Sequence, residues 1–130
     1  MPPDRGEASE WLDIARHELA AARHLLAPGA LEPGVAAYLA HQSAEKALKG
    51  FLTHHEQTFE KTHDLTRLLG LCEAVDPDMS RFRGAAARLT PFVVRFRYPG
   101  PFLPTRPEAE AAVLDAEGVV DWIGRVIEAR

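Results

Sequence analysis

Residues that could do chemistry gather in two short polar segments of the chain. The first, residues 41–49, reads HQSAEKALK. In a helix, His41, Glu45 and Lys49 share one face, because residues four apart are neighbours on the helix surface. Glu45 and Lys49 could also form an ordinary surface ion pair, which contributes about 0.2–0.5 kcal/mol. This segment is therefore either a candidate site, with Lys46 beside it, or a solvated helix face.

The second segment, residues 61–64, reads KTHD and has the composition of a polar helix start. His63 could act there as a general acid or base, because an unperturbed histidine has a pKa of about 6.5. It could equally be a structural residue that orders the turn. His63 is the candidate for proton transfer near this point of the chain.

Other chemistries find little support. His17 and His24 could share a helix face, and His54 and His55 are adjacent, but neither pair has a zinc-binding spacing. The chain has one cysteine, Cys72, which lies among leucines and is expected to be a buried, inert thiol. Phosphate-binding and dinucleotide-binding glycine motifs are missing from the sequence. We therefore predict no metal ion and no cofactor.

Charge is unevenly distributed along a chain whose formal net charge is −4. Between Met79 and Pro107 there are six arginines and no acidic residue, and an acidic stretch follows from Glu108 to Asp121. The acidic total argues against a surface that binds nucleic acid all over. The two stretches could bind an anion, or they could pair with each other, with solvent or with a second copy.

Length and composition indicate one globular domain over residues 1–130. The chain has 130 residues, of which 46% are hydrophobic and 26% charged, and this excludes disorder as the default. Its apolar runs are too short to span a bilayer, and its first residues do not resemble a signal peptide. A cytoplasmic location without membrane contact is the expectation.

The hydrophobic pattern predicts an all-α, up-and-down antiparallel bundle of about five helices. Their expected ranges or starting points are Ser9–Ala27, Gly34–His55, Thr62 or Asp64, Asp76 and Thr105. We expect Pro91 to kink or divide the fourth helix, and a rigid loop over residues 98–104. Thr105 and Glu108 form a capping box for the last helix.

Three ordered motifs resemble the HEPN family, the higher eukaryotes and prokaryotes nucleotide-binding domain. The segment YLAHQSAEKALKGFL, residues 38–52, is similar to the second helix of that family. THDLTRLL, residues 62–69, resembles its entrance to the third helix, and RYPG, residues 97–100, resembles its turn before the last helix. Trp11 and the apolar stripe of the first helix also fit. The resemblance therefore implies a domain core at about residues 10–127.

This resemblance implies a helical bundle that dimerises and is often encoded beside a minimal nucleotidyltransferase, in some cases as a toxin–antitoxin pair. Ribonuclease members of the family carry an arginine followed, after four to six residues, by a histidine. In this sequence no arginine has a histidine at that spacing, and no histidine follows His63. The resemblance therefore favours a non-catalytic module over a metal-independent ribonuclease, with a purely structural dimerisation bundle as a further alternative.

The predicted function is binding of a nucleotide or polynucleotide phosphate, or of a partner nucleotidyltransferase. The candidate nucleotide- or anion-binding residues are Lys46, Lys49, His63, Arg97 and Tyr98. His63 and Arg97 are also the candidates for catalysis, should the protein be a ribonuclease. A homodimer is expected because the second helix has an alanine-rich face, and exposed small apolar residues often contact a partner.

Overall fold

All elements of the described residues are helical. The structure, a computed structural model, describes residues 5–29, 32–93 and 104–129, and contains no strand in these ranges. The elements are α1 (Arg5–Leu25), α2 (Pro33–His54), α3 (Leu65–Val75), the 3₁₀ helix η1 (Pro77–Phe82), α4 (Arg83–Leu89) and α6 (Arg106–Glu128). The predicted all-α class is confirmed.

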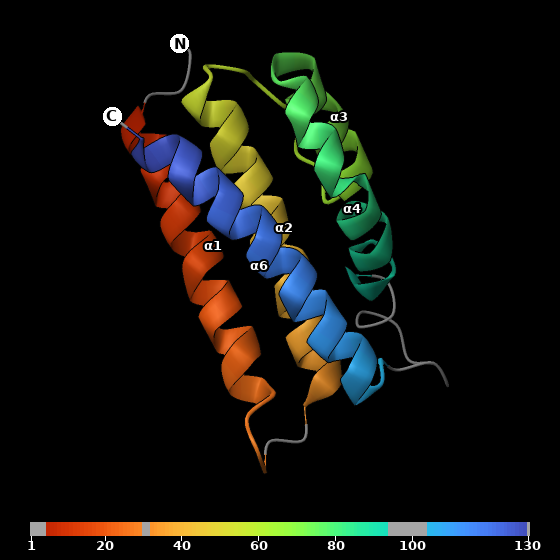
Figure 1. The fold of residues 1–130 in the computed structure, drawn as a ribbon. Coiled ribbons are helices and arrows are strands. Elements are labelled where there is room, and N and C mark those ends of the chain that lie inside the picture. The colour runs from red at the N-terminus through yellow and green to blue at the C-terminus, as the bar shows by residue number, and fades with distance from the viewer. Residues whose placement is uncertain (1–4, 30–31, 94–103, 130) are drawn as a thin grey trace.

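The long helices run up and down beside one another (Figure 1). Helix α2 returns antiparallel to α1, and α6 packs against both of them. On the other side of α2, the shorter α3 runs in the same direction as α2, and η1 and α4 then turn back down, so α2 is covered from several directions. This central position of α2 decides the surroundings of the polar residues on it.

Local sequence signals explain most helix ends. Pro33 occupies the first turn of α2, where its missing N–H costs nothing. The Asp64 side chain caps α3 by accepting a hydrogen bond from the backbone N–H of Arg67. The capping box of Thr105 and Glu108 at the start of α6 is present as predicted.

One expected boundary is wrong, and one helix that begins where expected is of a different type. Helix α1 does not begin at Ser9 but includes Arg5, because Ala8 is fully buried and extends the apolar face of this helix by a turn. The segment after Asp76 starts as a 3₁₀ helix and becomes α-helical only at Arg83. Helix α4 ends at Leu89, and residues 91–93 are helical again, so Pro91 divides the segment.

The alanine-rich face of α2 lies inside the core of a single chain. Its alanines are at most 1% exposed: Ala36, Ala37, Ala40, Ala44 and Ala47. Small side chains let α1 and α6 approach α2 closely, and a Cβ added at Gly50 would lie 3.1 Å from the Cβ of Trp11. This face is therefore no surface for a second copy, and our sequence-based reason for a dimer is wrong.

Candidate functional site

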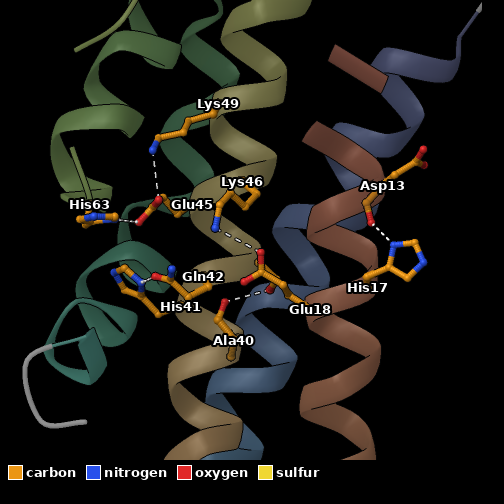
Figure 2. Close-up of polar contacts among 11 residues, drawn as sticks. Asp13, His17, Glu18, Ala40, His41, Gln42, Glu45, Lys46, Lys49 and His63 are labelled. Carbon is orange, nitrogen blue, oxygen red and sulfur yellow. Dashed lines mark hydrogen bonds and ion pairs between the residues drawn. The ribbon is translucent and has the colours of Figure 1, made fainter. Parts of the chain in front are cut away.

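The buried carboxylate of Glu45 holds two cationic or titratable side chains (Figure 2). Lys49 Nζ lies 3.1 Å from its Oε2, and His63 Nδ1 lies 2.9 Å from its Oε1. The Glu45 side chain is fully buried, whereas that of His63 is 54% exposed. Because a carboxylate only accepts, His63 carries its proton on Nδ1 and directs the other ring nitrogen away from Glu45.

Lys49 is enclosed by aromatic rings as well as by Glu45. Its Nζ lies 5.7 Å from the ring centre of Trp11 and 6.0 Å from that of Phe59. The two rings meet edge to face. An ammonium group among ring faces and a carboxylate has little freedom, so Lys49 is a fixed counter-charge for Glu45.

His41 lies one turn before Glu45 and is completely buried. Its Nδ1 is 3.0 Å from Gln42 Oε1, and its Nε2 has no hydrogen-bond partner among the described residues. Burial lowers the pKa of His41, and this effect outweighs the opposing effects of Gln42 and Glu45. His41 is therefore a neutral imidazole close to a second, half-exposed one.

Two elements bring this cluster together. The spacing of four places His41, Glu45 and Lys49 along one side of α2. His63 reaches the same side from the turn before α3, where the Asp64 backbone N–H donates to the Thr62 hydroxyl. The THD segment is thus a structured helix cap whose histidine points back to α2, as Figure 2 shows.

The sequence-predicted site residues do not all meet. Lys49 and His63 share Glu45, but Lys46 points to α1, where its Nζ lies 3.1 Å from Glu18 Oε1. Arg97 and Tyr98 lie outside the described residues. The loop expected over residues 98–104 also lies outside them, except for Pro104. The interpretation of Glu45 and Lys49 as a solvated surface pair is wrong, because α3 and the aromatic rings cover them.

Two other groups considered from the sequence, His17 and Cys72, have local structural explanations. The ring of His17 contacts the backbone oxygen of Asp13 on the exposed side of α1. Burial raises the pKa of the Cys72 thiol to about 12, which leaves it protonated and unreactive. Within the described ranges, no three His, Cys, Asp or Glu side chains are grouped so as to hold a metal ion.

Much of the arginine-rich stretch pairs within the chain. Arg88 binds Asp115 of the acidic stretch with two hydrogen bonds of 2.9 Å. Arg83 pairs with Glu73, and Arg106 pairs with Glu110 and also donates to the backbone oxygen of Leu26. Self-pairing therefore explains these three arginines, whereas Arg81 stacks on the ring of Trp122.

Sequence reasoning missed the burial of His41 and the aromatic enclosure of Lys49. The polar residues within 41–49 have the composition of a solvated helix face. Trp11 and Phe59, which enclose Lys49, are distant from it in sequence. One signal was available: the apolar residues of α2 occur on nearly all sides of the helix, which is typical of a central helix. Such a helix buries its polar residues too.

The chain belongs to the HEPN domain family, whose sequence profile matches residues 8–126. Among solved structures, it resembles TT1696 from Thermus thermophilus, with 31% identity, a TM-score of 0.76, and coverage of 91% of this chain and 96% of that one. It also resembles ST0689, an archaeal HEPN homologue, with 23% identity, a TM-score of 0.74 and coverage of 93% and 98%. The curated proteins give no match.

Within the described residues, every helix is too short or too polar to cross a bilayer.

Proposed function

We propose that this HEPN domain binds a phosphate group of a nucleotide or polynucleotide through His63, without cleaving the chain that carries it. The observation that carries the proposal is the half-exposed imidazole of His63 held by the buried Glu45–Lys49 pair. Lys49 balances the charge of Glu45, so a protonated His63 adds a positive charge to this surface. Its outward ring nitrogen then donates a hydrogen bond to a phosphate oxygen.

We add Arg97 and Tyr98 to the proposed site because they belong to the RYPG motif, which resembles the turn before the last helix of the family. The guanidinium of Arg97 suits phosphate oxygens, and the ring of Tyr98 suits stacking on a base. If Arg97 were only structural, we would expect it to pair with Glu45 or Asp64. Glu45 already has two partners and Asp64 caps α3, so both carboxylates are engaged without it.

A specific observation also favours a second candidate function, a metal-independent ribonuclease. A histidine oriented by a carboxylate is the arrangement of a general base, and here His63 would accept the proton of a 2′-hydroxyl group. His41 supplies a second imidazole nearby, which sequence reasoning did not anticipate. His41 is fully buried, however, and a buried group does not reach a leaving oxygen. Binding without cleavage is therefore the better-supported function.

One pair of assays separates these functions. Fluorescence anisotropy with a labelled 2′-O-methyl oligonucleotide, which cannot be cut through its 2′-oxygen, measures binding alone. We expect salt-sensitive binding that His63→Ala weakens by about tenfold or more, as for loss of a charge-assisted hydrogen bond. His17→Ala, at an exposed histidine on α1, is the matched control. Binding unchanged by His63→Ala contradicts the proposal.

Digestion of unstructured RNA in EDTA tests the second candidate. We expect no robust cleavage. If the wild type cuts and both His63→Ala and Arg97→Ala lose about tenfold or more, the ribonuclease replaces our proposal. If neither binding nor nucleotide-dependent thermal stabilisation occurs, the purely structural bundle replaces both, because ligand-linked stability requires binding to the native state.

The family resemblance adds two partners to this proposal. They are a second copy of the chain and a minimal nucleotidyltransferase, encoded beside it as the other half of a toxin–antitoxin-like pair. A phosphate-binding surface is suited to such a partner, since that enzyme transfers nucleotides. Co-purification with a nucleotidyltransferase encoded by a neighbouring gene tests this part of the proposal.

A further inference from the structure

Two arginines differ from the others whose side chains the structure describes, because they have no carboxylate partner. Six arginines pair with an acidic side chain: Arg16, Arg23, Arg67, Arg83, Arg88 and Arg106. Arg81 of η1 and Arg125 of α6 do not, within the described residues. Both instead contact the same aromatic ring, that of Trp122.

The geometry around Trp122 fixes one of these arginines firmly. The Arg81 Cζ lies 3.7 Å from the ring centre, which is stacking distance, and its Nε donates to the backbone oxygen of Asp78 at 3.3 Å. The Arg125 Cζ lies 5.9 Å from the same ring. Phe82 packs edge to face against Trp122 and holds the indole in place.

This arrangement leaves a set of hydrogen-bond donors around Trp122 without acceptors. The terminal nitrogens of Arg81 and Arg125 bind no acceptor within the described part of the chain. The indole N–H of Trp122 also lacks an acceptor there, but it is buried beneath the surface. Beside them is a surface hollow lined by Trp122, Arg125, Val126 and Ala129. A guanidinium that is already immobilised by stacking loses little further freedom on binding an anion.

We propose that Arg81, Arg125 and Trp122 form a binding site for a phosphate group, separate from the His63 site. Two guanidinium groups at one ring carry two positive charges. A phosphate, with a charge of about −1.5 to −2 at neutral pH, matches them better than a single carboxylate does. The apolar side chains of the adjacent hollow suit a ligand whose phosphate adjoins a less polar group. A nucleotide or a phosphorylated small molecule has that chemistry.

The indole N–H resonance of Trp122 reports on this site directly. The chain has two tryptophans, so a ¹H–¹⁵N spectrum contains two indole signals, and Trp122→Phe identifies the relevant one. The full-length protein is titrated with inorganic phosphate, with AMP, with an acidic peptide and with sodium chloride at matched ionic strength. We expect a saturable shift with phosphate or AMP, and none with chloride.

Variants assign the shift to the two arginines. Arg81→Gln and Arg125→Gln should each weaken the affinity for phosphate or AMP by about tenfold, as loss of a charge-assisted hydrogen bond does. Arg67→Gln, at an exposed and paired arginine, should leave the titration unchanged. Tighter binding by AMP than by inorganic phosphate identifies a nucleotide as the ligand; equal binding identifies the phosphate alone. Three results would overturn the proposal: a shift that does not saturate, an affinity that neither arginine variant changes, or tighter binding of the acidic peptide than of phosphate and AMP.

Discussion

His63 and Glu45 lie 18 positions apart in sequence, yet their side chains meet at 2.9 Å across the boundary between solvent and core. The exposed imidazole is held by a carboxylate that solvent does not reach. The same carboxylate neutralises the buried ammonium of Lys49. Glu45 is therefore responsible both for the position of His63 and for the stability of α2.

Glu45→Gln should destabilise the fold strongly. The substitution keeps the shape of the side chain but leaves the buried charge of Lys49 without its counter-charge, and breaking a buried pair costs about 3–5 kcal/mol. Urea denaturation measures the change. Glu60→Gln removes an exposed partner of Arg67 and should change the stability little. Equal effects of the two variants would show that the Glu45–Lys49 pair acts as a surface pair.

Acidification should destabilise the protein as the pH falls below about 6.5, the ordinary pKa of histidine. Burial lowers the pKa values of His41 and His55, so the unfolded chain takes up protons that the folded chain does not. Stability from these groups is present above that pH and is lost below it, by up to about 1.4 kcal/mol per pH unit for each group.

The variant His41→Gln isolates one of these groups. Its urea midpoint should depend less on pH between about 7 and 5 than that of the wild type, since the titrating group is gone. His24→Gln, at an exposed histidine, should reproduce the wild-type dependence. A slope unaltered by His41→Gln would show that His41 does not supply the effect.

Two glycines in helices should respond to alanine with opposite signs. At Gly50, a Cβ would meet the Trp11 Cβ at 3.1 Å and the Ala8 backbone oxygen at 3.4 Å, so α1 and α2 must separate slightly and stability falls. At Gly70 a Cβ meets nothing within 4 Å, and alanine is the better helix former by about 0.5–1 kcal/mol. Thermal unfolding of both variants checks this; stabilisation by Gly50→Ala would contradict the close helix contact.

Cys72 should resist thiol reagents until the protein unfolds. Its side chain is buried and its pKa is raised to about 12, so almost none is thiolate at neutral pH. Reaction with a chromogenic disulfide should be slow in buffer and fast in denaturant. Rapid reaction in buffer would indicate that α3 opens locally from α2.

We still predict that the chain forms a homodimer, now on the family resemblance alone. Light scattering at micromolar concentration should give twice the chain mass of 14.3 kDa. A monomeric mass at that concentration would refute the dimer. It would leave both phosphate-site proposals standing, since their described residues belong to one chain.

Sequence patterns predicted the elements that depend on neighbouring residues. The bounds of α2 lie within one residue of expectation, and the caps at Asp64 and Thr105 follow from local side-chain chemistry. Even here, tertiary packing overrode a local signal at Ser9, because burial of Ala8 carries α1 past a good capping residue.

The candidate site was predictable only in part, because its character comes from long-range contacts. His63 and Lys49 were identified by residue type, but their common partner Glu45 was interpreted as part of a solvated face. Lys46 matched the same motif yet pairs with α1, since one residue along a helix turns a side chain by about 100°. The contact of Arg81 and Arg125 with Trp122 was not anticipated. Arg81 belongs to a basic stretch whose other described arginines pair with acidic residues of the same chain, so its sequence context did not distinguish it.

The position of α6 has a consequence for how the protein is made. Helix α2 buries its alanine face partly against α6, and residues 106–128 leave the ribosome long after α2 does. While the chain is being translated, α2 thus has an uncovered apolar side beside an already paired α1. We therefore expect chaperones that bind exposed apolar segments to recognise this side of α2 until α6 docks.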